Sequence, residues 1–160
     1  MHLVNVTRWI HIISGISWFG EVLTLNVVLV PALQRLAKRE RILLMKNAFP
    51  RVFRLASVLS ATTVLSGILM NYLMTNGWKN LTVFPVRWWV NIVVGGTLGL
   101  LLTLFHFFME TRLEPIVTDP DAADSADVDR SLHRLKVIPR TGMAILLIIV
   151  LMMMIAPRGI

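Results

Sequence analysis

The sequence predicts an all-α integral membrane protein, an up-and-down bundle of four helices forming one domain over residues 1–160. Hydrophobic residues make up 56% of the chain and charged residues only 16%, a balance that is typical of membrane proteins. Four apolar runs reach the roughly 20 residues that a helix needs to cross about 30 Å of hydrocarbon. These runs cover residues 6–33, 52–75, 86–109 and 137–155.

Each predicted helix ends at a recognisable break in the sequence. Pro31 and the basic tract "QRLAKRERILLMK" end the 6–33 run, and "TNGWKN" followed by Pro85 separates the second run from the third. The acidic stretch "DPDAADSADVD" precedes the last run and predicts a solvated loop that caps a short helix leading into it. Short connections favour antiparallel neighbours. We therefore expect loops over residues 34–51 and 110–136.

The distribution of basic residues predicts the orientation. The net charge is +7, and the basic residues are concentrated in the two predicted loops. The positive-inside rule places these loops in the cytoplasm and both termini on the outer side of a multi-pass plasma-membrane protein. Such clusters match anionic lipid headgroups, so nucleic acid is not an expected partner. Four tryptophans then form an aromatic belt at the outer interface: Trp9, Trp78, Trp88 and Trp89.

An outer candidate site is formed by polar residues within the first span. His11, Gly15, Trp18 and Glu21 share a broad face of the 6–33 helix, together with Ser14. On the 86–109 helix, Arg87 and Asn91 have a matching depth. A histidine ligand, an arginine for a propionate and a glycine that admits a flat macrocycle would form a haem b pocket. Alternatively, His11 is hydrogen-bonded to a neighbouring helix and Arg87 reaches the headgroups.

An inner candidate site centres on His106. Gly95 and Gly99 lie on its stripe of the 86–109 helix, where they would either open space for a porphyrin held by His106 and His133 or pack closely against another helix. At a rise of about 1.5 Å per residue, His11 and His106 differ by about 25 Å in height. One haem cannot be held by both histidines. The candidate iron ligands are therefore His11, His106 and His133, at separate sites.

Glu21 and Arg87 are the candidate catalytic residues. Glu21 is expected to be either a proton relay or a protonated carboxyl hydrogen-bonded inside the bundle. Asn26, Asn71 and Asn91 are expected to form hydrogen bonds between helices. Copper is disfavoured as a cofactor, because successive methionines of "LMMMIA" point in different directions on a helix. The chain has no cysteine, which excludes thiolate ligation and c-type haem attachment.

Three segments resemble the HemJ-type and CopD-type membrane protein families. They are "RWIHIISGISWFGEVLTLNVVLVPAL", "FPVRWWVNIVVGGTLGLLLTLFHFF" and "HRLKVIPRTGMAILLIIVLMMMIAP". The resemblance implies a helical bundle that binds haem b, with His11 at a ligand position and Arg87 where the HemJ pattern has lysine. HemJ-type proteins are associated with oxidation of protoporphyrinogen IX, and CopD-type proteins with copper handling.

Two departures from the HemJ pattern bear on that chemistry. The Arg87 guanidinium stays charged and cannot release a proton as a lysine can. Val137 and Ile138 replace the Asn-Glu pair that precedes the proline in that pattern.

The expected function is therefore electron transfer by a haem b-binding membrane protein, alone or as a small subunit of a respiratory-type complex. One alternative is a HemJ-like protoporphyrinogen IX oxidase, which would make the chain an oxidoreductase. Another is a cofactor-free accessory subunit whose glycine face packs against other membrane subunits or a second copy. The sequence does not decide whether the chain is an enzyme.

Overall fold

The computed structural model describes residues 2–118 and 125–155, without the side chains of Lys38, Val83 and residues 112–136. The described residues form helices and turns and contain no strand. Helix α1 (His2–Thr24) continues through a π-helical turn, η1 (Leu25–Leu29), into α2 (Val30–Arg35). The later elements are α3 (Lys38–Met74), a short 3-10 turn η2 (Leu81–Val83), α4 (Val86–Thr118) and α5 (Ser125–Ile155).

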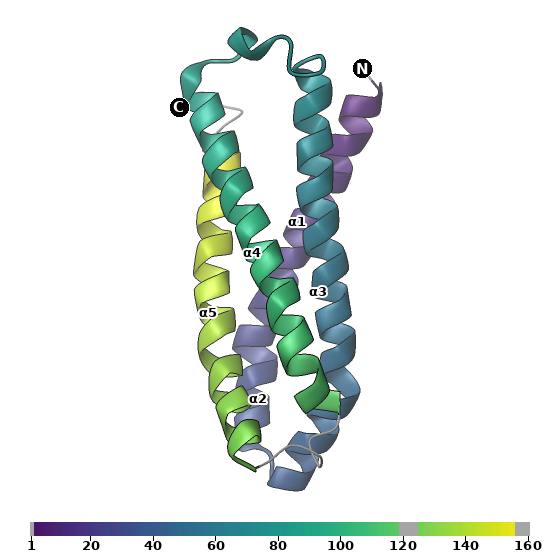
Figure 1. The fold of residues 1–160 in the computed structure, drawn as a ribbon, viewed down its shortest axis with the longest axis vertical. Coiled ribbons are helices and arrows are strands. Elements are labelled where there is room, and N and C mark those ends of the chain that lie inside the picture. The colour runs from purple at the N-terminus through teal and green to yellow at the C-terminus, as the bar shows by residue number, and fades with distance from the viewer. Residues whose placement is uncertain (1, 119–124, 156–160) are drawn as a thin grey trace.

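The four predicted spans are confirmed as helices. Within the described part of the chain, four helical segments are long and apolar enough to cross a membrane: His2–Arg35, Arg39–Met74, Val86–Thr111 and Val137–Ile155. Figure 1 shows them as an up-and-down bundle in which α1 packs on α3, α3 on α4, and α4 on α5, while α5 returns to α1. The start of α1, the connection between α3 and α4, and the end of α5 all lie at one end of the bundle (Figure 1).

The helices extend well beyond the spans that hydropathy predicts. Helix α3 begins at Lys38 and α4 runs to Thr118, so much of the loops predicted over 34–51 and 110–136 is helical. Only Leu36 and Ala37 separate α2 from α3. The extension of α3 is rich in Lys, Arg, Glu, Leu and Met, which favour helix without making a segment apolar enough to count as a span. At about 1.5 Å per residue, the 37 residues of α3 are about 55 Å long.

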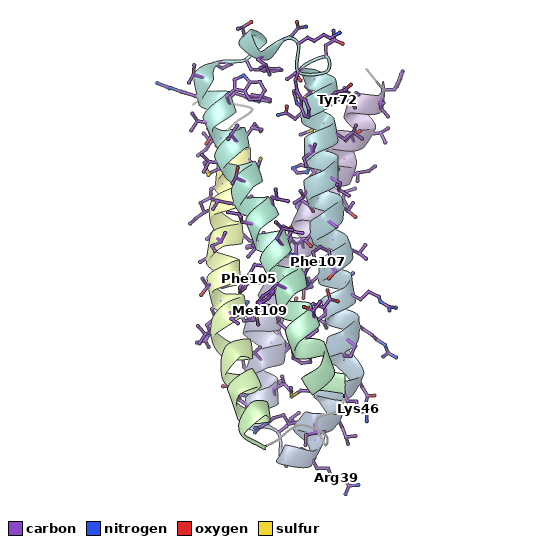
Figure 2. The ribbon with its side chains drawn as sticks, in the orientation of Figure 1. Arg39, Lys46, Tyr72, Phe105, Phe107 and Met109 are labelled. Atoms are coloured by element: carbon purple, nitrogen blue, oxygen red, sulfur yellow. The ribbon has the colours of Figure 1, made fainter. Side chains whose placement is uncertain are left out.

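The extension of α3 is held by its own apolar cluster. Met45 and Phe49 are 1% and 0% exposed, and they pack with Leu25, Leu33 and Phe53. Phe49 and Phe53 meet edge to face with ring centroids 5.7 Å apart. Charged side chains occupy other positions of the same segment, and Arg39 and Lys46 lie at the opposite end of the bundle from Tyr72 (Figure 2). The segment is thus an amphipathic continuation of the span.

A second apolar cluster lies in the middle of the bundle. Trp18 is 3% exposed and packs with Leu146 and Ile149 of α5. Trp18, which was expected to line a haem pocket, is therefore part of the helix-packing core between α1 and α5. A buried aromatic ring of this size contributes a large apolar area to such a core.

The π-helical turn positions an asparagine between two helices. Nδ2 of Asn26 donates hydrogen bonds to the carbonyl oxygens of Val22 (2.8 Å) and Pro139 (2.9 Å). The second bond links the first span to α5, so the expected interhelical role of Asn26 is confirmed. Asn91 differs, because its Nδ2 donates to the carbonyl oxygen of Arg87 in its own helix at 3.0 Å. Asn71 accepts a hydrogen bond from Nε1 of nearby Trp78.

Candidate functional site

His11 lies in the interface between α1 and α3, with a defined ring orientation. Its Nδ1 is 2.8 Å from the carbonyl oxygen of Thr63. Since a carbonyl oxygen can only accept, Nδ1 carries the proton and Nε2 carries the lone pair. A hydroxyl, that of Ser66, also approaches Nδ1 at 3.4 Å. Among the described residues, Nε2 of His11 has no hydrogen-bond partner.

Small residues bring α1 and α3 close together around this histidine. A Cβ atom at Gly67 would lie 2.9 Å from Cε1 and 3.1 Å from Nδ1 of His11, so the ring edge occupies the space that the glycine leaves. One turn further along α1, the Thr63 hydroxyl donates to the Ser14 hydroxyl at 3.0 Å. Gly15 also faces Thr63, whose Cγ2 would be 3.5 Å from an added Cβ. Gly15 therefore packs against α3 and does not form an open surface for a macrocycle.

The predicted partners of His11 on α4 do not meet it. The side chain of Arg87 is exposed, and Asn91 bonds its own helix. Trp88 stacks on Phe84 with ring centroids 4.2 Å apart. The main neighbour of α1 is α3, because α1 continues through η1 and α2 and only Leu36 and Ala37 then precede α3, which makes the two spans adjacent and antiparallel. Among the described residues, neither Arg87 nor Asn91 forms a hydrogen bond with His11, and the outer pocket stays a prediction.

The glycine stripe of α4 is partly filled by α5. A Cβ at Gly95 would lie 2.8 Å from Cε of Met153, so this glycine packs against a methionine side chain. Gly99 is buried, yet no atom lies within 4 Å of its added Cβ. At Gly95, the glycine stripe therefore serves close packing between α4 and α5.

His106 is engaged through the nitrogen that a haem would need. Its Nε2 is 3.2 Å from the hydroxyl of Ser57 and 3.4 Å from the carbonyl oxygen of Phe53, both on α3. The Ser57 hydroxyl in turn donates a hydrogen bond to Oε2 of Glu110. The remaining nitrogen, Nδ1, lies next to the atom that joins the ring to the helix, where a macrocycle would collide with the backbone. His133 is in α5, but its side chain is outside those that the structure describes, so its predicted pairing with His106 stays a prediction.

Among the side chains that the structure describes, two buried polar atoms have no hydrogen-bond partner. They are Oε2 of Glu21 and Oγ1 of Thr103, and Thr103 is only 4% exposed. The expected hydrogen bond from a neighbouring helix to this oxygen of Glu21 is therefore not formed. An unpaired buried acceptor is costly and calls for a functional or solvent-related explanation.

Glu110 was not among the residues selected from the sequence. It follows His106 by four residues, so the two share one face of α4. The apolar run of this helix ends at residue 109, which places Glu110 in the predicted loop. An acidic residue at that helical spacing from a buried histidine is the signal that could have identified it.

We also searched for metal-binding clusters and for similar proteins. Among the side chains that the structure describes, no group of three or more His, Asp or Glu residues is placed to hold a metal ion. Comparisons with protein-family models, curated proteins and solved structures each found no match for this chain.

Proposed function

We propose that the chain is a haem b-binding membrane protein that transfers electrons, in which His11 would hold the iron. The observation that carries the proposal is the orientation of His11. Ligating histidines commonly donate one ring N–H to a carbonyl or carboxylate, which fixes the tautomer and leaves the other nitrogen for the metal. His11 has this arrangement, with Nδ1 on the Thr63 carbonyl and Nε2 without a hydrogen bond.

The donor set fits one axial position of a haem. His106 uses Nε2 for Ser57, and Arg87 is exposed on α4, which is not the main neighbour of α1. The second face of the haem would therefore be supplied by another membrane subunit or by a second copy of the chain. When bound, haem b supplies one-electron chemistry, and the imidazole and the surrounding apolar residues tune its potential.

We also propose which end of the bundle faces the cytoplasm. The exposed basic residues of α3, including Arg39, Lys46 and Arg51, lie towards the end of the bundle where α3 begins. The positive-inside rule assigns this basic end to the cytoplasm and both termini to the outer side of the plasma membrane. His11 then lies in the outer half of the bilayer.

A cofactor-free accessory subunit is the second candidate, and one observation favours it. The contact of the His11 ring with Gly67 is also what a purely structural histidine would make between two closely packed membrane helices. In that case the Thr63 bond stabilises the α1–α3 pair, and Nε2 has no ligand.

A visible spectrum separates the two candidates. The protein would be expressed in membranes that contain its natural partners, purified in mild detergent, and measured as a reduced-minus-oxidised difference with pyridine haemochrome quantitation. We expect a b-type spectrum in the parent and in His106→Ala, and its loss in His11→Ala with unchanged helical circular dichroism. A parent without haem would overturn the proposal in favour of the accessory subunit, and a spectrum that survives His11→Ala would overturn the assignment of the ligand.

A further inference from the structure

A second polar site lies between α3 and α4, towards the basic end of the bundle and away from His11. It consists of His106, Ser57 and Glu110, which form a continuous hydrogen-bonded chain. Ser57 is 9% exposed and is the middle member of these three hydrogen-bonded residues. The arrangement differs from a hydrolytic triad, because here serine is the bridging group and donates to the carboxylate.

The direction of the hydrogen bonds follows from the number of protons available. The Ser57 hydroxyl has a single proton, which it donates to Oε2 of Glu110. Its oxygen must therefore accept from Nε2 of His106, at 3.2 Å. Each group thus has a partner of the correct type, and the chain runs from the imidazole through the hydroxyl to the carboxylate.

We propose that His106, Ser57 and Glu110 are a proton-transfer site that carries protons between the middle of the bundle and its basic end. When His106 is protonated, its Nε2 proton moves to the Ser57 oxygen as the hydroxyl proton of Ser57 moves to Glu110. One N–H bond and one O–H bond break, and two O–H bonds form. The imidazolium becomes neutral, the carboxylate becomes a carboxylic acid, and Ser57 is unchanged.

Glu21 is the group in the middle of the bundle that this site would serve. His11 lies against Gly67, and Ser14 bonds Thr63. Because α1 and α3 are antiparallel, continuing the pairing of His11 with Gly67 and of Ser14 with Thr63 along both helices places Glu21 at the same height in the bundle as Ser57. Its Oε2 is buried without a partner. Thr103, whose hydroxyl is also unpaired, lies on α4 about 4.5 Å along the axis from His106.

Among the described side chains, few other charged groups surround the site. On α3 the nearest is Arg54, three residues before Ser57, and its side chain is exposed. In the described part of α5 the ionisable residue is Arg140, which is also exposed. Among the described side chains, Glu21 on α1 and Glu110 on α4 are thus the acidic groups near this site. Ionisable residues placed inside a membrane bundle commonly form proton relays.

The test follows the protonation of Glu21 after a pH jump. The parent in lipid nanodiscs would be monitored by time-resolved infrared spectroscopy between about pH 3 and pH 8, a range that spans carboxyl and imidazole titration. The Glu21→Gln variant assigns the carboxyl band. We expect Ser57→Ala to slow the change of that band by about tenfold, with the same final amplitude, since one hydrogen-bonded step is lost. Glu110→Gln slows it likewise.

Two variants control for a structural effect. Ser57→Thr keeps the hydroxyl and should restore the parent rate. Ser60→Ala removes a fully buried hydroxyl that donates only to the backbone carbonyl of Ser57, and it should leave the rate unchanged. A parent rate in both Ser57→Ala and Glu110→Gln, or a Glu21 band that does not respond to pH, would overturn the proposal. The infrared readout needs no haem, so its outcome is independent of the proposed cofactor.

Discussion

Replacing Gly67 by alanine should separate α1 from α3 at His11. The added Cβ would lie 2.9 Å from Cε1 and 3.1 Å from Nδ1 of the imidazole, closer than packed atoms tolerate. The ring cannot move away without lengthening the 2.8 Å hydrogen bond between Nδ1 and the Thr63 carbonyl. Gly67→Ala therefore tests whether this contact fixes the orientation of His11.

The magnitude combines three terms. Overpacking of a closely packed interface costs about 1–3 kcal/mol, and the loss of one hydrogen bond costs about 1 kcal/mol. Alanine regains about 1 kcal/mol over glycine in a helix interior. The free energy of unfolding should therefore fall by about 1–3 kcal/mol. Haem binding, where it depends on the orientation of His11, should weaken in parallel.

Gly96→Ala is the matched control, because Gly96 is on α4 and no atom lies within 4 Å of its added Cβ. This variant should be as stable as the parent, or more stable by up to about 1 kcal/mol. Both variants would be unfolded with sodium dodecyl sulfate in mixed micelles and followed by tryptophan fluorescence. If Gly67→Ala proved as stable as Gly96→Ala, the close contact between the two helices would not exist in the membrane, and the reasoning would fail.

Three further substitutions test other contacts by the same unfolding assay. Asn26→Ala removes the side-chain amide that donates to the carbonyl oxygens of Val22 and Pro139. It should lower the free energy of unfolding by about 1–2 kcal/mol. An unchanged free energy of unfolding would mean that the hydrogen bond to α5 is not formed. Thr103→Val replaces a buried hydroxyl without a partner and should be neutral or stabilising by up to about 1 kcal/mol, whereas clear destabilisation would reveal a partner such as bound water. Gly95→Ala would displace only the flexible end of Met153, so it should cost less than about 1 kcal/mol, and a larger loss would indicate that the thioether is held rigidly.

The number and order of the helices could be predicted from the sequence, because crossing hydrocarbon imposes length and apolarity on each span. The extensions could not be predicted in the same way. Met45 and Phe49 are as buried as any residue of the spans, but they alternate with charged residues that reduce the local hydropathy. Only helical periodicity beyond the apolar window, read together with the apolar face of the first span, would have revealed that α3 begins at Lys38.

The candidate site was predicted in part, since depth along a helix follows from the sequence and the identity of its neighbour does not. His11 and Arg87 share a similar depth, yet they belong to helices that are not principal neighbours in the bundle. The partner of His11 is instead a backbone carbonyl at Thr63, and no side-chain pattern identifies such an acceptor. His106 and Glu110, in contrast, have helical spacing in the sequence, but the predicted helix ends at residue 109, whereas α4 runs to Thr118 and includes Glu110.

The length of α3 bears on the kinds of membrane that can contain this protein. Transmembrane helices rarely tilt by more than about 40°, and at that tilt a helix of about 55 Å still spans about 42 Å of bilayer thickness. Part of α3 must therefore emerge from the hydrocarbon at every tilt that is commonly observed. Because this part is already helical and its backbone is hydrogen-bonded, a thicker bilayer can cover another turn of it without exposing unpaired peptide groups. Hydrophobic mismatch should consequently be a weak determinant of where the protein resides.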